Sequence, residues 1–180
     1  MEDLSLHILD IAENSVAAGA RLITIAVLED TGRNMLRIEI TDDGIGMEPG
    51  VAERAPDPFY TSRTTRRVGL GLALLHEAAE AANGALEIRS IPGRGTTVTA
   101  TFQLDHIDRK PLGRMAETIM ALLLTRSNLD ILYTHTRGGR SVVFDTKTIR
   151  DQLGGIALNS VGAISAIRER LNEEEETLAH

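Results

Sequence analysis

The sequence contains no cysteine, and this absence removes several kinds of site at once. Disulfides, thiolate zinc sites, iron–sulfur clusters and cysteine nucleophiles all require a thiol. A chain of 180 residues can still bury most of its apolar surface without covalent cross-links. We therefore expect one globular domain, or one domain with a small appendage, and a reducing compartment would suit it.

Long apolar runs and an excess of positive charge are also missing. The longest stretch without Asp, Glu, Lys or Arg, residues 152–167, contains glycines and serines and falls short of the roughly 20 apolar residues of a membrane span. The N-terminus is acidic, whereas a secretory signal needs a basic segment there. The 26 acidic residues outnumber the 19 basic ones, which disfavours duplex DNA as the main ligand. We expect a cytoplasmic protein that binds neither nucleic acid nor membranes.

Apolar spacing over residues 1–108 predicts the order helix, two strands, loop, helix, two strands. The first helix is expected over 4–18, and the second opens at Gly69 and stops at Asn83-Gly84. The strands are expected over 22–28, 35–41, 85–91 and 96–104. This order predicts an α+β fold with the helices on one face of a mixed sheet.

Residues 109–180 are predicted to form a small C-terminal α/β extension, made of a helix, a hairpin around Gly138-Gly139 and a last helix capped by Ser160. We place the boundary between the two domains near residues 106–113. The apolar helices of the extension are expected either to pack on the first domain or to form a homodimer seam. The acidic run 173–176 is expected to be a solvated, fraying end without a role.

The segment DIAENSVAAGA carries the first candidate chemistry. Asp10 and Asn14 are four residues apart, so a helix places both on one face. An amide oxygen beside a carboxylate suits Mg²⁺, which takes further ligands from water and phosphates. A polar surface helix gives the same pattern, so this segment alone does not decide between the two readings.

The segment TDDGIGM places Asp42 at the end of a strand, before two glycines, Gly44 and Gly46, that allow a tight turn. A carboxylate there can accept a hydrogen bond from the amino group of adenine. Guanine offers a carbonyl at that position, so the same carboxylate would reject it. Aspartate and glycine are also ordinary turn residues, which is the simpler interpretation of this segment taken alone.

The segment RRVGLGLALL places Gly69, Leu70 and Gly71 at the start of a helix, whose free N–H groups can bind phosphate oxygens. Arg66 and Arg67 directly precede this helix and suit an anionic ligand, although a solvated basic loop would look the same. The GxxxxGK[ST] pattern of a P-loop is absent. The phosphate-binding interpretation therefore depends on the helix start and not on a P-loop.

These three segments are followed by SIPGRGTTVTATF, which places Thr96 at the head of a strand. In this order and spacing the four segments resemble the nucleotide-binding boxes of the GHKL (Bergerat-fold) ATPases, the superfamily of gyrase, heat-shock chaperones, histidine kinases and mismatch-repair proteins. DIAENSVAAGA is similar to the mismatch-repair version, whereas DPFYTS, GLGLALL and the last segment are similar to the catalytic domain of histidine kinases. The resemblance covers residues 4 to about 104 and implies a Bergerat-type two-layer sandwich.

The resemblance implies a role for each matching residue. Asn14 would coordinate the Mg²⁺ that bridges the phosphates of ATP, Asp42 would read the adenine amino group, and Thr96 would support the adenine. Gly44 and Gly46 would border the base. Gly69 and Gly71 would let the chain wrap the phosphates, and residues 47–68 would form a short ATP lid. We count Arg66, Arg67 and Leu70 with them as candidate nucleotide-binding residues.

Two features depart from the family pattern. The ATP-hydrolysing members usually carry a glutamate as general base four residues before the asparagine, whereas this chain has Asp10, which is shorter by one methylene. We prefer Asp10 as the base, with Glu13, which directly precedes Asn14, as the alternative. The chain also begins almost at the first motif, so we expect no phosphoacceptor-histidine domain, and we interpret His7 as a structural or surface residue.

Three functions are compatible with this pattern. The first is a Mg·ATP-binding protein, an ATPase or protein kinase, that phosphorylates or regulates a separate partner protein, as the serine-kinase anti-sigma branch does. Asp10 favours it because a serine hydroxyl benefits from a base. The alternative is an ATP-gated interaction module with slow or no hydrolysis. A DNA-linked ATPase is the least favoured, because of the acidic charge and the short C-terminal segment.

Overall fold

The computed structural model describes residues 3–55, 70–126, 128–152, 154 and 157–179. The helices are α1 (Leu4–Ala17), α2 (Pro49–Arg54), α3 (Leu70–Ala81), α4 (Met115–Thr125), α5 (Thr146–Gln152) and α6 (Val161–Ala179). The strands are β1 (Leu22–Asp30), β2 (Met35–Asp42), β3 (Ala85–Ile91), β4 (Gly95–Gln103), β5 (Asp130–Arg137) and β6 (Arg140–Asp145). All the predicted helices and strands are present, and their bounds differ from the predicted ones only near the ends.

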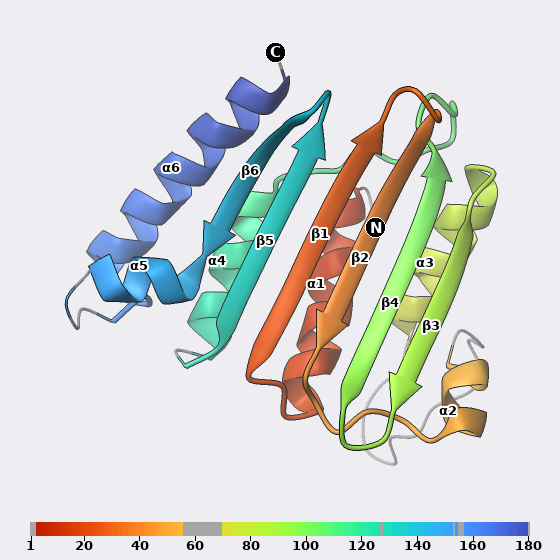
Figure 1. Ribbon diagram of the computed structural model, residues 1–180, viewed down its shortest axis with the longest axis horizontal. Helices are drawn as coiled ribbons and strands as arrows, with labels where there is room; N and C mark the ends of the chain where they lie inside the picture. Colours follow the sequence, from red (N-terminus) through yellow and green to blue (C-terminus); the bar gives the residue numbers. More distant parts are fainter. Residues whose placement is uncertain (1–2, 56–69, 127, 153, 155–156, 180) are drawn as a thin grey trace.

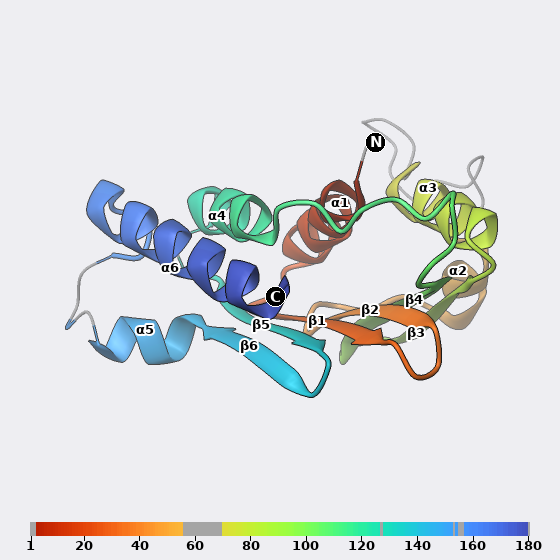
Figure 2. The same ribbon diagram turned by 90° about the horizontal axis from the view of Figure 1, so that it is seen from above.

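The strands of the described chain form one mixed sheet in the order β3-β4-β2-β1-β5-β6, which Figure 1 shows face on. Neighbouring strands pair antiparallel, except that β1 and β5 run parallel. Helices α1, α3, α4 and α6 cover one face of the sheet (Figure 2). The prediction of an α+β fold with helices on one face of a mixed sheet is therefore confirmed.

The first helix shows how the sequence produces this layer. Asp3 caps α1 by accepting the backbone N–H of Leu6, and the chain leaves the helix before Gly19, whose φ of +81° favours glycine. One stripe of the helix is buried against the sheet and consists of Leu4, Ile8, Ile11, Ala12 and Ser15. The i, i+4 and i+7 spacing of this stripe fixes which side of α1 faces the sheet and which side carries Asp10 and Asn14.

The core lies between this helical layer and the sheet. In β1 and β2 every second residue is buried, and the register places Ile25 opposite Ile40 and Val27 opposite Ile38. Strand β5 adds the fully buried Tyr133 to the same core. The threonine side chains that alternate with these positions lie on the other face, which no helix covers within the described residues.

The hairpin of β5 and β6 extends the same sheet and does not form a separate layer. Because β5 runs parallel to β1, the chain needs a crossover between them, and α4 lies in that crossover. Thr118 of α4 donates a hydrogen bond to the carbonyl of Ser5 in α1 (3.1 Å), which joins the two helices. The domain boundary near residues 106–113 stays a prediction, but the sheet continues across it.

Two short helices were not predicted from the sequence. Helix α2 lies inside the segment that we expected to be a loop, and it buries none of its residues. Helix α5 buries only Thr146. Neither helix has an apolar stripe, so hydrophobic spacing carries no information about them. Among the described residues, no helix is both long and apolar enough to cross a membrane.

The acidic run 173–176 was wrongly predicted to be a fraying end without a role. It lies inside α6, and Glu175 accepts hydrogen bonds from the Tyr133 hydroxyl and from Nδ1 of His135 (2.8 Å). The other ring nitrogen of His135 lies 3.0 Å from Glu29 of β1. The two carboxylates, the imidazole and the phenol, which we call the Glu29–Glu175 network, fasten the last helix to the sheet.

Candidate nucleotide site

The candidate site is built around Asp42, the last residue of the central strand β2. Its register partners are Ile23 on β1 and Thr96 on β4, and only 9% of Asp42 is exposed. One carboxylate oxygen, Oδ1, accepts the backbone N–H of Gly44 (2.9 Å) and of Thr96 (3.3 Å). The structure thus brings together three residues, Asp42, Gly44 and Thr96, that the sequence placed in two separate motifs.

Ser15, which the sequence motifs did not identify, completes the surroundings of this carboxylate. Its hydroxyl lies 2.6 Å from Oδ2 of Asp42, to which it donates, and only 4% of the residue is exposed. The pattern contained a signal, because Ser15 continues the buried stripe of α1 that includes Ile8 and Ile11. A serine on a buried stripe needs a polar partner, and a strand-end aspartate supplies one.

A second serine, Ser90 at the end of β3, was also missed. Its Oγ accepts the backbone N–H of Met47 (2.8 Å) and lies 2.8 Å from the hydroxyl of Thr96. It also donates to the carbonyl of Gly95 (3.1 Å). Ser90 therefore joins the loop that follows β2 to the turn between β3 and β4.

The loop after β2 is tied down along its length. Oδ1 of Asp43 accepts the backbone N–H groups of Arg21 (2.7 Å) and Leu22 (2.9 Å). Ile45 donates its N–H to the carbonyl of Ala18 (3.1 Å), just beyond α1. These bonds hold the loop against both α1 and β1, so the carboxylate of Asp42 has a fixed orientation.

Two glycines make the close approach of these segments possible. Gly46 has a φ of +67°, and a Cβ there would lie 2.2 Å from the carbonyl oxygen of Ile91. Gly95 has a φ of +102°, and a Cβ there would lie 1.9 Å from the carbonyl oxygen of Asp42. Any other residue at these positions would push the two loops apart. Of these two glycines, the sequence motifs identified only Gly46 as a site residue.

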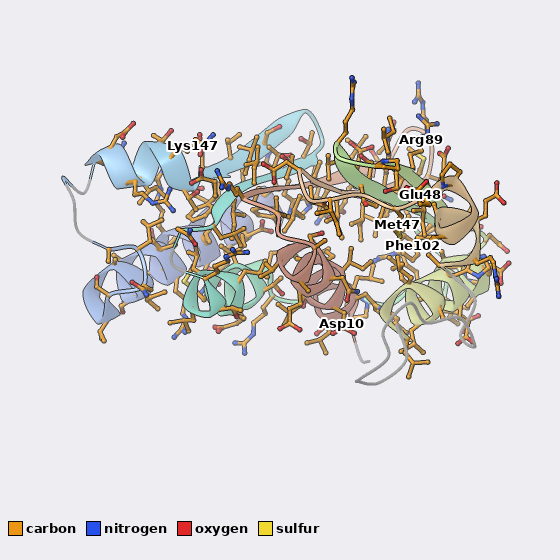
Figure 3. All side chains as sticks on the ribbon, turned by 90° about the horizontal axis from the view of Figure 1, so that it is seen from below. Asp10, Met47, Glu48, Arg89, Phe102 and Lys147 are labelled. Atoms are coloured by element: carbon orange, nitrogen blue, oxygen red, sulfur yellow. The ribbon has the colours of Figure 1, made fainter. Side chains whose placement is uncertain are left out.

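Asp10 lies on the side of α1 that faces the start of α3 (Figure 3). A Cβ built on Gly71 would lie 3.1 Å from the Cβ of Asp10, so this glycine lets the two helices approach. Burial raises the pKa of the Asp10 carboxyl above its usual range. Asn14 follows one turn later and is exposed, as is Glu13. Leu70 is 46% exposed at the beginning of α3.

Three of the predicted phosphate-binding residues lie outside the described residues: Arg66, Arg67 and Gly69. The same holds for most of the predicted lid, of which the structure describes residues 47–55. This part contains α2. It begins at Met47, which Figure 3 places close to the sheet and which Ser90 holds by its backbone.

The donor set of α1 fits Mg²⁺ better than a metal that takes several protein ligands. Asp10 and Asn14 offer oxygen atoms one helical turn apart, and Mg²⁺ commonly takes one or two protein oxygens together with water and phosphate. No cluster of three or more His, Cys, Asp or Glu residues that could hold a metal occurs in the described part of the chain. Such a pair is therefore suited to a metal that arrives with a phosphorylated ligand.

The chain is similar to a known family over its first part. The family described as "Histidine kinase-, DNA gyrase B-, and HSP90-like ATPase" matches residues 2–106. The "Non-motile and phage-resistance protein" of Caulobacter vibrioides is 36% identical over 98 residues, which are 52% of this chain and 12% of that protein. The "Sensor protein kinase FleS" of Pseudomonas aeruginosa is 36% identical over 110 residues, which are 61% of this chain and 27% of that protein. The chain thus spans about a quarter or less of the length of these relatives.

A solved structure described as the N-terminal domain of a DNA repair protein shares the fold. Its TM-score to this chain is 0.55 at 17% sequence identity, and the match covers 79% of this chain and 52% of that one. This coverage exceeds the part matched by the family, so the similarity of fold includes some of the chain beyond residue 106.

Proposed function

We propose that this chain, which belongs to the histidine kinase-, DNA gyrase B- and HSP90-like ATPase family, binds Mg·ATP at Asp42 and transfers its γ-phosphoryl group to a separate partner protein. The family match supports ATP binding. One observation carries the location of the site: the buried carboxylate of Asp42 is held by Ser15, Gly44 and Thr96 at the end of the central strand.

Recognition of adenine follows from the hydrogen bonds that Asp42 already makes. A carboxylate oxygen can accept two hydrogen bonds, and Oδ2 receives one from Ser15, so it can accept another from the amino group of adenine. The carbonyl of guanine would face this oxygen with no proton between them. A buried acceptor left without a partner costs about 1–3 kcal/mol, which is enough to favour ATP over GTP.

The metal and the phosphates would lie between α1 and α3. Asp10 lies against Gly71 at the beginning of α3, where the free N–H groups of the helix attract anions, and Asn14 follows one turn later on α1. Bound Mg²⁺ would neutralise charge on the phosphate oxygens. Gly71 would let the phosphates approach the backbone closely, and Leu70 would cover them from the exposed side.

Asp10 is the residue best suited to move a proton. Burial raises its pKa, which makes the carboxylate a stronger base than an exposed aspartate. It would take the proton of a serine hydroxyl while the hydroxyl oxygen forms a bond to the γ-phosphorus and the bond to the β–γ bridging oxygen breaks, releasing ADP. Water in place of the hydroxyl would give hydrolysis instead of transfer.

Labelled ATP tests the transfer step. The purified protein is incubated with γ-³²P-ATP and a lysate of its source cells, beside an Asp10→Asn variant and an Asp108→Asn control at an exposed site. We expect a labelled partner with the parent protein and the control, and a loss of at least about a hundredfold in labelling with Asp10→Asn. ATP binding by all three proteins, measured by calorimetry, should be similar.

Two results would contradict parts of the proposal. If ATP binds but no protein acquires label, the phosphotransfer is wrong and an ATP-gated interaction module becomes the better description. If GTP binds with the same affinity as ATP, the assignment of Asp42 to the adenine is wrong. If Asp10→Asn labels the partner fully, Asp10 is not the general base, and either Glu13 is the base or the reaction uses none.

A further inference from the structure

The outer edge of β6 is free for pairing within the described part of the chain, because β6 is the last strand of the sheet and pairs only with β5. Gly138 and Gly139 form a two-residue turn with φ values of +57° and +79°, and Arg137 pairs with Arg140 beside it. In such a hairpin the residues next to the turn exchange hydrogen bonds, and every second pair does the same. The backbone groups of Ser141 and Val143 therefore point toward the free edge.

A groove runs along this edge. It has a volume of about 680 Å³, and its lining consists of four consecutive residues of β6, 140–143, and of Glu173, Glu174, Thr177 and Leu178 from α6. Figure 1 shows α6 running beside β6 at the end of the sheet. A groove between an edge strand and a helix is the arrangement that accepts an extended peptide as an added strand.

The groove has an apolar floor and an acidic wall. Val142 and Leu178 are buried at its base, 6% and 4% exposed, while Glu173 of α6 is an exposed residue of its lining. Glu174 is partly compensated by Arg170 (2.8 Å). The one cation of the lining, Arg140, donates to the carbonyl of Thr177 (3.1 Å) near the C-terminal end of α6. The lining itself carries two carboxylates and one guanidinium, so its formal net charge is −1, which favours a basic ligand.

The wall of the groove is held in place before any ligand arrives. Glu175, the neighbour of Glu174, is bound by Tyr133 and His135 of β5 through the Glu29–Glu175 network. Hydrogen bonds to both Glu29 and Glu175 keep His135 between two carboxylates. A preformed groove lowers the cost of ordering that binding would otherwise include.

We propose that the edge of β6 accepts an extended segment of a partner protein in which apolar and basic side chains alternate. The backbone of the segment would pair with Ser141 and Val143. Its apolar side chains would pack on the face of the sheet that is open in the described chain, beside Val143, which is 56% exposed, and its basic side chains would point to the other face, toward Glu173 of α6. A second copy of this chain fits less well, because its own α6 lies beside its β6 and would enter the same groove.

A blocked, fluorescein-labelled peptide of eight residues that alternates valine and lysine is a suitable probe. The matched control peptide has glutamate in place of lysine. Fluorescence anisotropy should show that the lysine peptide binds at least tenfold more tightly than the glutamate peptide to the full chain. Amide hydrogen exchange should slow at Ser141 and Val143 when the lysine peptide is bound.

Two variants test separately the backbone pairing at the edge of β6 and the charge that α6 contributes to the groove. Val143→Pro removes an edge donor without removing a bond to β5, and it should weaken peptide binding at least tenfold. Glu173→Arg should weaken it severalfold, whereas Glu176→Arg, in the same acidic run but outside the lining, should have no effect. Urea unfolding of each variant verifies that it is folded.

Three outcomes would overturn the proposal: equal affinity for the two peptides, unchanged exchange at Ser141 and Val143, or identical effects of Glu173→Arg and Glu176→Arg. Sedimentation adds a fourth. A dimer of the parent chain that Val143→Pro dissociates would show that a second copy occupies the edge instead.

Discussion

Two ends of the sheet are held together in different ways. At the nucleotide end, which comprises the loop after β2 and the turn before β4, short backbone contacts at Gly46 and Gly95 fix the geometry. At the other end, where β1 finishes and α6 lies over β5, buried side chains fix it through the Glu29–Glu175 network. Both arrangements join residues far apart in the chain, but the first uses backbone atoms that glycine allows to approach closely, and the second uses the polar groups of buried side chains.

Two buried histidines, His7 and His135, differ in the electrostatic surroundings of their rings. His7 of α1 is fully buried, and within the described residues neither ring nitrogen has a hydrogen-bond partner; burial lowers its pKa to about 4. Burial would also lower the pKa of His135, but hydrogen bonds to Glu175 and Glu29 outweigh it and raise the pKa to about 9. We therefore expect His7 to be neutral and His135 to be charged at neutral pH. We predicted from the sequence that His7 is either a structural or a surface residue, and its full burial excludes the surface.

The largest effect is expected at Gly95. A Cβ in Gly95→Ala would lie 1.9 Å from the carbonyl oxygen of Asp42, so β4 or the loop after β2 must move. We expect a loss of roughly 4 kcal/mol or more in the free energy of unfolding, together with a loss of ATP binding. Gly93→Ala is the matched control, because it has a similar φ of +74° but no atom within 4 Å of the added Cβ. It should lose only about 1 kcal/mol in urea unfolding.

At the other end of the sheet, Glu175→Ala is the most direct test of the Glu29–Glu175 network. Glu175→Ala leaves the buried Tyr133 hydroxyl and Nδ1 of His135 without their acceptor, and we expect a loss of about 3 kcal/mol in the free energy of unfolding. ATP affinity should change by less than about twofold, since the network lies at the opposite end of the sheet. The exposed Glu176→Ala should be nearly neutral. A similar loss in both variants would contradict the assigned network.

The pH dependence of stability distinguishes the two histidines. His135 has a raised pKa, so its stabilising contribution is complete below about pH 6.5 and is lost as the pH rises through about 9. His7 has a lowered pKa, so stability falls as the pH drops from 6.5 toward about 4. Each effect can reach about 2–3 kcal/mol. His135→Gln should flatten only the alkaline limb of the unfolding free energy measured against pH, and His7→Leu only the acidic limb.

The smallest effect sharpens the description of the nucleotide end. Ser15→Ala removes the hydrogen bond to Oδ2 of Asp42, and we expect ATP affinity to fall by about 1 kcal/mol, or roughly fivefold, in calorimetry. The preference for ATP over GTP should fall with it, because the carboxylate loses part of its orientation. Ser5→Ala, another buried serine of α1, should leave affinity unchanged. Unchanged affinity in Ser15→Ala would limit the serine to a structural role.

Much of the fold was predictable because the helices and strands with one buried face carry their period in the sequence. Helix α1 and strands β1 and β2 are of this kind, and their bounds were close. The short helices α2 and α5 have no such face and were missed. The prediction for residues 173–176 was wrong because four glutamates in a row are typical of a solvated segment. Helix α6 instead places one of them, Glu175, against Tyr133 and His135.

The part of the candidate site whose residues lie close together in the sequence was also predictable. Asp42 and the glycines beside it lie within a few residues of each other, so a single motif names them. Ser15 and Ser90 reach the site from α1 and β3, and their partners become visible only when β2 and β4 are paired. The assigned role of Asp10 stays a prediction that the labelling experiment tests, and the role of Asn14 also stays a prediction.

The sequence by itself determined the local features: where helices and strands run, which glycines permit turns, and which carboxylates stand at their ends. Only the tertiary structure decided that β5 pairs with β1, that Ser15 meets Asp42 across 27 residues, and that Glu175 lies 40 residues from its partner His135. The physical reason is that backbone conformation depends on neighbouring residues, whereas the partner of a buried polar group depends on strand order and on packing over long separations.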